Sequence, residues 1–170
     1  LLYKDMGQYE KAEPIYTEVL AIQEKVLGKE HPDYASGLNS SAEVYYRMSQ
    51  YEKAETGWLE AKAIREKVLG KEHRHYAQTL GNLGLLYSKM GQHEKAETFF
   101  TGSSQLNRKL VLLALNHLSE QEMNQYLMTF NNGISAIFSF DQRTSGTTGI
   151  AKTGYDNILF FKGFLLNAYQ

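Results

Sequence analysis

The stretch that decides the fold is Tyr9-Glu-Lys-Ala-Glu13, because it occurs three times. It returns as Tyr51-Glu-Lys-Ala-Glu55 and as His93-Glu-Lys-Ala-Glu97, each time 42 residues later. A second stretch, Val26-Leu-Gly-Lys-Glu-His31, returns as Val68-Leu-Gly-Lys-Glu-His73 at the same spacing. Self-similarity at a fixed period of roughly 20–50 residues is typical of repeat proteins. The sequence therefore predicts a chain built from one structural unit used repeatedly.

Each repeat has the pattern of two amphipathic helices. In the segment 33–48, apolar residues recur at steps of four and three, which places Leu38, Ala42 and Tyr45 on one face. The segment 51–69 does the same with Ala54, Trp58, Ala61, Ile64 and Val68. Because neither helix can bury its apolar face alone, neighbouring pairs are expected to stack into a solenoid.

Glycine and proline mark the ends of these helices. Gly7 and Gly91 suit the turn inside a helix pair, where a residue with positive φ is needed. Gly28 and Gly70 suit the end of the second helix. Pro32 follows the Gly-Lys-Glu-His connector and is typical of the first residue of a helix.

These residues resemble the tetratricopeptide repeat pattern. The last unit matches it at Leu80, Leu83, Gly84, Tyr87, Ala96 and Phe100, and the middle unit at Leu38, Ala42, Tyr45, Ala54, Trp58 and Ala61. The 42-residue period and the connector resemble the longer variant of kinesin light chains. The resemblance implies an all-α, right-handed superhelical solenoid of about two and a half units over residues 1–110, with additional C-terminal helices over 111–170.

Composition excludes several classes of protein. The 170 residues carry 18 Lys and Arg against 19 Asp and Glu, a net charge of −1, which excludes a strongly basic nucleic-acid binder. There is no cysteine, so thiolate metal sites and cysteine nucleophiles are excluded and a cytoplasmic location is expected. No apolar run is long enough for a transmembrane helix, so no membrane association is expected. The chain begins without Met and is expected to be a piece of a longer protein, which the resemblance implies is bacterial.

The resemblance implies a binding groove lined by the first helix of each pair. Spacing supports this independently, because polar residues of the middle unit share one helix face opposite the apolar stripe. Their amides and cations suit an extended peptide backbone or a carboxylate, although a merely solvated face has the same pattern. We expect a protein-interaction scaffold that is not an enzyme and needs no cofactor. The candidate residues are Asn39, Glu43, Tyr46, Arg47, Gln78, Asn82, Leu85 and Lys89.

The histidines do not predict a metal site. His73 and His75 form a His-x-His pair, but no cysteine or carboxylate cluster accompanies them. His31 and His73 occupy the same place in the connector of two repeats, so the repeat itself accounts for them.

The C-terminal part, residues 111–170, differs in composition. It holds 7 of the 37 charged residues and six of the eight phenylalanines. A helix opening at Ser119-Glu-Gln-Glu122 and the stretch Asn157-Ile-Leu-Phe-Phe resemble the segment that precedes the caspase-like peptidase in bacterial repeat–CHAT proteins. The resemblance implies an alternative function as the regulatory arm of such a peptidase, whose catalytic domain is missing here.

Two further hypotheses concern this part and the first residues. The Gly/Ser/Thr-rich segment 141–153 is expected to be a loop, and residues 146–153 nearly match a phosphate-binding loop. No strand–loop–helix alternation surrounds them, so nucleotide binding is a remote alternative. Exposed apolar residues at Leu1, Leu2 and Tyr3, together with the Phe-rich tail, favour a homodimer as a further hypothesis.

Overall fold

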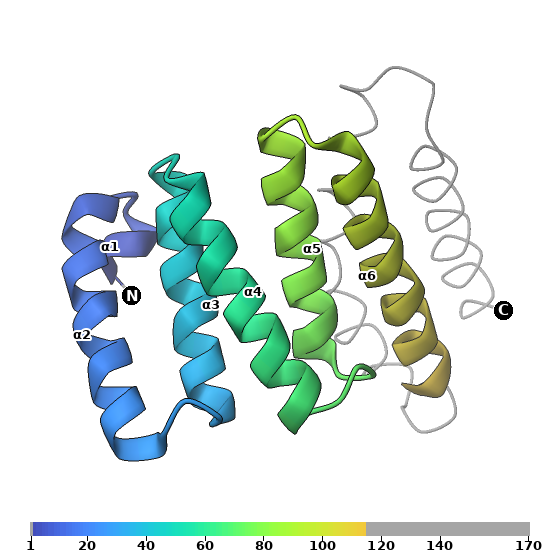
Figure 1. Ribbon diagram of the computed structural model, residues 1–170, viewed down its shortest axis with the longest axis horizontal. Coiled ribbons are helices and arrows are strands. Elements are labelled where there is room, and N and C mark those ends of the chain that lie inside the picture. Colours follow the sequence, from blue (N-terminus) through green and yellow to red (C-terminus); the bar gives the residue numbers. More distant parts are fainter. Residues whose placement is uncertain (1, 115–170) are drawn as a thin grey trace, which may run out of the picture.

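The computed structural model describes residues 2–114, which form six helices (Figure 1). No strand occurs within this range, and the predicted all-α solenoid is confirmed. The helices are α1 (Leu2–Asp5), α2 (Tyr9–Leu27), α3 (Pro32–Arg47), α4 (Tyr51–Val68), α5 (Arg74–Lys89) and α6 (His93–Ala114).

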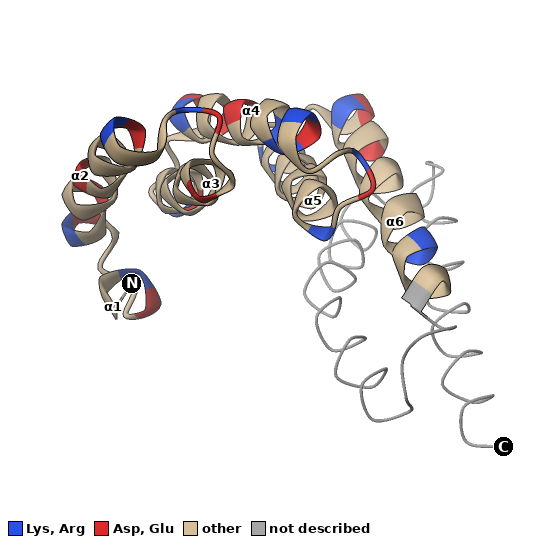
Figure 2. Cartoon of the chain, turned by 90° about the horizontal axis from the view of Figure 1, so that it is seen from below, with Lys and Arg blue, Asp and Glu red and all other residues tan. Residues whose placement is uncertain are grey.

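The helices stack in chain order into a curved row. Each helix packs against the next one along the chain. Figure 2 shows α1, α3 and α5 on the inner side of the curve, with α2 and α4 on its outer side. Helix α6 runs past residue 110 to Ala114. The remainder of the C-terminal part, including the segment 141–153 and the expected additional helices, lies outside the described residues.

Histidine side chains cap the N-termini of two inner helices. The Nδ1 atom of His31 accepts a hydrogen bond from the backbone N–H of Asp33 at 3.1 Å, and Pro32 is the first residue of α3 as predicted. Likewise, Nδ1 of His73 accepts from the backbone N–H of His75 at 3.1 Å and caps α5. Because the first N–H groups of a helix have no intrahelical partner, this cap explains the repeated histidine physically.

The turns use the predicted glycines. Gly7 and Gly91 have φ of 71° and 72° between the helices of a pair, and Gly28 and Gly70 have φ of 82° and 83° between pairs. Ser49 takes the place of glycine in the middle unit and still adopts φ of 60°. The turn geometry is therefore set by the repeat rather than by the side chain at that position.

The core alternates small and large residues at equivalent positions of the repeats. Ala54 and Ala96 let neighbouring helices approach closely, while Trp58 and Phe100 fill the space beyond, each 2% exposed or less. The Nε1–H of Trp58 donates to the backbone oxygen of Asn39 at 3.2 Å. This bond satisfies the indole and ties α4 to α3.

Surface ion pairs also repeat with the period of the fold. Lys67 pairs with Glu30, and Lys109 pairs with Glu72, so the outer helix of one unit reaches the connector of the unit before it. All four side chains are at least half exposed. Such pairs contribute at most about 1 kcal/mol each, so the stacking depends mainly on the apolar core.

Candidate functional site

The predicted binding residues lie on two neighbouring inner helices. Asn39, Glu43, Tyr46 and Arg47 belong to α3, and Gln78, Asn82, Leu85 and Lys89 belong to α5. We refer to these eight residues as the inner surface. The structure divides them into residues that hold the two helices together and residues that are open to solvent.

Asn39 links the two helices rather than facing solvent. Its Oδ1 accepts a hydrogen bond from Nδ2 of Asn82 at 3.0 Å, and its side chain is part of the buried core, 8% exposed. Its backbone oxygen is also taken by Trp58. Asn82 is half-buried and keeps further hydrogen-bonding capacity. Asn39 therefore orients Asn82 and has little surface of its own for a ligand.

Glu43 is held by a residue that the sequence analysis did not single out. Lys4 of α1 donates from Nζ to Oε2 of Glu43 at 2.9 Å. Burial alone would lower the pKa of Lys4, but the hydrogen bond and the charge of Glu43 outweigh it and raise that pKa. The pair joins the first two units across the inner face, so Glu43 is already neutralised.

Tyr46 and Leu85 pack against the core at its inner edge. The Tyr46 ring lies 5.7 Å from the ring of Trp58 and 6.0 Å from that of Tyr51, both tilted by about 50°. Leu85 is half-buried beside the same cluster. Both residues are partly open and offer apolar surface next to the polar groups.

Arg47, Gln78 and Lys89 are the exposed members of the inner surface. Arg47 and Lys89 stand at equivalent positions, 42 residues apart, in the last turns of α3 and α5. Within the described residues, neither forms an ion pair with a carboxylate. Cations near the C-terminus of a helix interact favourably with the helix dipole, so these positions suit Arg47 and Lys89 even without an ion-pair partner. The arrangement leaves two repeated cations available to an anionic group.

A buried cation lies at the junction of α4 and α5, away from the inner surface. Arg65 is 3% exposed, and its Nη1 donates to Oγ1 of Thr79 at 2.6 Å and to the backbone oxygen of His75 at 2.9 Å. Burial lowers the pKa of Arg65 to about 10. Burial and the charge of Arg65 also lower the pKa of His75. These hydrogen bonds join α4 to α5.

The rings of His73 and His75 lie 5.0 Å apart, edge to face. Nδ1 of His73 serves as the helix cap, so it is not available as a ligand in this geometry. Among residues 2–114 no cluster of three His, Cys, Asp or Glu side chains has the arrangement of a metal site. Over the same residues no helix is both long and apolar enough to cross a membrane.

The repeats of this chain match a known protein family. The tetratricopeptide repeat model matches residues 1–56 and 34–109. The chain belongs to the tetratricopeptide repeat family. Tetratricopeptide repeats in general support a role as a protein-interaction scaffold, and the expectation of kinesin-light-chain-like repeats is supported in fold by the two solved structures that follow.

Two solved structures share the arrangement of this tetratricopeptide repeat array. The crystal structure of BtubC (BKLC) from P. vanneervenii aligns with a TM-score of 0.67 at 19% identity, covering 95% of this chain and 61% of that one. Nearly identical TPR-like repeats named as kinesin light chain from Podosopora anserina align with a TM-score of 0.53 at 18% identity, covering 98% and 85%. At these identities the likeness is one of fold. Among curated proteins no relative matches the chain.

Proposed function

We propose that this chain is a non-enzymatic scaffold that binds an extended peptide with an acidic side chain along its inner surface. The observation that carries the proposal is the pair of exposed cations, Arg47 and Lys89, repeated at equivalent positions of α3 and α5. A carboxylate that reaches either cation would gain a charge-assisted contact.

The neighbouring groups suit the rest of such a peptide. Asn82 and the exposed Gln78 each carry an amide, which can donate to and accept from a peptide backbone. Tyr46 and Leu85 supply half-buried apolar surface beside them. Asn39 and Glu43 take part indirectly, because each is held by a partner within the chain.

The experiment selects ligands without assuming a partner. A display library of nonapeptides is panned against the full chain, and the recovered peptides are measured by calorimetry. We expect enrichment of Asp and Glu, and a loss of affinity of about tenfold or more in Arg47→Glu with Lys89→Glu. The matched control reverses two exposed lysines on other helices, Lys25→Glu with Lys95→Glu, and should bind normally. Equal loss in both variants, or recovery of peptides without acidic residues, would refute the proposal.

The remaining hypotheses from the sequence do not depend on the inner surface. The role as regulatory arm of a CHAT peptidase depends on residues 111–170, which beyond Ala114 lie outside the described residues, as does the near-match to a phosphate loop at 146–153. The cytoplasmic location rests on the absence of cysteine. For the proposed homodimer, the structure supplies exposed apolar side chains at Leu2 and Tyr3, 72% and 39% exposed.

A further inference from the structure

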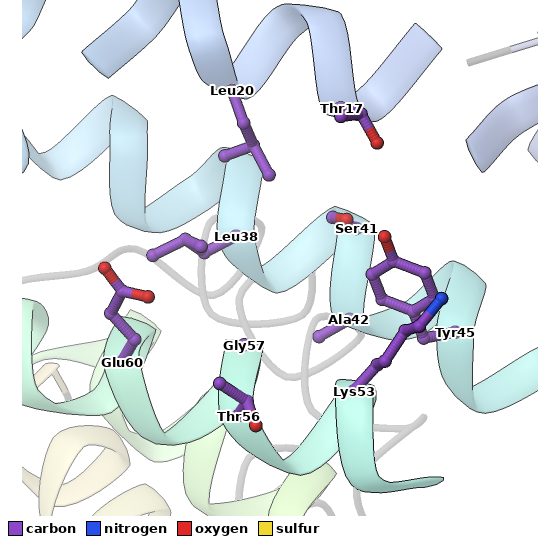
Figure 3. Close-up of a pocket in the computed structure, with 10 residues that line it drawn as sticks. All are labelled: Thr17, Leu20, Leu38, Ser41, Ala42, Tyr45, Lys53, Thr56, Gly57 and Glu60. Carbon is purple, nitrogen blue, oxygen red and sulfur yellow. The ribbon is translucent and has the colours of Figure 1, made fainter. Parts of the chain in front are cut away.

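A pocket of about 320 Å³ opens between α2 and α4, with α3 as its floor (Figure 3). It lies between two outer helices, whereas the inner surface is carried by α3 and α5. Its walls are mostly apolar, with Leu20, Leu38 and Ala42 on one stretch and Tyr45 at one end. Leu38 and Ala42 are buried, so the pocket reaches the core.

The next junction along the array shows what this pocket lacks. At the equivalent place between α4 and α6, Phe99 packs on Tyr87 with ring centres 5.3 Å apart and planes 19° apart. The residue 42 positions before Phe99 is Gly57, and the residue 42 positions before Tyr87 is Tyr45. Tyr45 and Tyr87 each have a lysine Nζ 4.9 Å from the ring centre, from Lys53 and Lys95. The two sites therefore share the tyrosine and the lysine above it, and the first site lacks the second aromatic ring.

A second substitution enlarges the same space. Ser41 stands where the next unit has Leu83, a fully buried leucine. A side chain at Gly57 would crowd Ala42, because its Cβ would lie 3.0 Å from the Cβ of Ala42. The residue equivalent to Ala42 in the next unit is Gly84, which has no Cβ. The repeat thus accommodates a ring at one junction and leaves the equivalent volume open at the other.

The two ends of the pocket carry opposite charges. Figure 3 shows the carboxylate of Glu60 at the end beside Leu38, and the ammonium of Lys53 at the other end beside Tyr45. The Lys53 side chain is 58% exposed, and its contact with Glu13 is long, at 3.5 Å. A bound segment therefore meets an acid at one end of the pocket and a base at the other.

We propose that this pocket binds a phenylalanine side chain of a partner protein, from a segment with a basic residue on one side of the phenylalanine and an acidic residue on the other. The ring stacks on Tyr45 as Phe99 stacks on Tyr87. The basic residue faces Glu60, and the acidic residue faces Lys53. The site is separate from the inner surface and does not depend on its occupancy.

The probes are two synthetic peptides, acetyl-Lys-Ala-Phe-Ala-Glu-amide and the same peptide with Lys and Glu exchanged. Each is titrated into the ¹⁵N-labelled full chain and followed by NMR. One order should shift the amide signals of Tyr45 and Gly57 at lower concentration than the other, by about threefold, as expected for exposed charge pairs. The matching peptide with Ala in place of Phe should leave these signals unmoved.

Three variants separate the ring site from the charges. Ala42→Gly with Gly57→Phe copies the filled junction and should abolish the shifts. Lys53→Glu with Glu60→Lys keeps the pocket and should reverse the preference between the two peptides. Phe99→Ala opens the second junction and should add a second set of shifts around Tyr87. Circular dichroism of each variant confirms that the helices are retained, and the charge-reversal variant carries the test if either of the others unfolds.

Several results would overturn the proposal. These are equal binding of the alanine peptide, an unchanged order preference in the charge-reversal variant, or no shift at Tyr45 and Gly57 with any peptide. Contacts between the Tyr45 ring and another phenylalanine of the same chain in the free protein would show that the pocket is filled from within. A lower mass of the filled variant in light scattering would show that a second copy occupies it. Either finding would contradict a partner segment.

Discussion

At the residue scale, the close contact of α5 and α6 depends on a glycine. A Cβ at Gly84 would lie 2.7 Å from the nearest atom of the Phe100 ring, which is fully buried and cannot move aside freely. At Gly81, on the same helix, the nearest atom would be Oγ of Ser103 at 3.4 Å. The two glycines differ in function although both lie within one helix.

We therefore expect Gly84→Ala to lower the free energy of unfolding by about 1–3 kcal/mol, because the ring and the helices must shift. Gly81→Ala should be neutral or stabilise by up to about 1 kcal/mol, since alanine favours the helix. Urea unfolding of both variants measures the difference. Equal effects would show that the Gly84 contact does not constrain the pair.

At the same scale, His75 makes stability depend on pH. Burial, followed by the charges of Arg65, His73 and Arg74, lowers the pKa of His75 below its ordinary value of 6.5. The unfolded chain then binds a proton more readily than the folded one, so this contribution to stability is complete above about pH 6.5 and is lost as the pH falls.

The variant His75→Gln should therefore lose less stability than the natural chain between about pH 7.5 and pH 5.5. Urea unfolding at both pH values gives the comparison, and the other histidines cancel because they are present in both proteins. A larger loss in the variant would contradict the assignment, because it would mean that protonation of His75 stabilises the fold.

At the element scale, the junctions between helix pairs are not equivalent. Arg65 and Thr79 form a buried hydrogen bond between α4 and α5. The residues 42 positions earlier are Gln23 and Gly37, and Oε1 of Gln23 is buried without a hydrogen-bond partner in the described part of the chain. The second junction is therefore fastened by a polar contact that the first one lacks.

Replacing Thr79 with Val removes an acceptor from a buried cation and should lower the free energy of unfolding by about 1–3 kcal/mol. Thr79→Ser keeps the hydroxyl and should lose about 1 kcal/mol or less, mainly through the missing methyl. The Thr79 hydroxyl also donates to the backbone oxygen of His75, four residues earlier. Thr98→Val is the control, because the exposed hydroxyl of Thr98 makes the same kind of bond to Glu94 but no hydrogen bond with an arginine. Among the three variants, Thr79→Val should have the lowest unfolding temperature. If Thr79→Ser unfolds at the same temperature as Thr79→Val, the hydrogen bond to Arg65 does not stabilise the junction.

Sequence patterns predict the elements better than the contacts between them. The 42-residue period, Pro32 and the turn glycines locate the helices that the structure shows. The period cannot show how one inner helix is rotated against the next, so it did not separate the buried Asn39 from the exposed Arg47, nor find Lys4 as the partner of Glu43. Comparing equivalent positions would have pointed to Gly57, because a small residue in the place where the next unit has Phe99 leaves space.

At the scale of the whole molecule, the array has two surfaces with different chemistry. The inner surface repeats a cation at Arg47 and Lys89, whereas the outer side changes from an open pocket beside Tyr45 to a filled one beside Tyr87. A solenoid whose units contact only their neighbours can vary one surface without altering the other.

The central claim is that the inner surface binds an acidic peptide, and mapping one such peptide on the full chain tests it directly. A peptide selected by display is titrated into the ¹⁵N-labelled chain, and the shifted amide signals are assigned to helices. We predict that the largest shifts fall on the inner surface, around Arg47 in α3 and from Gln78 to Lys89 in α5. Shifts confined to α2, α4 and α6 would contradict it.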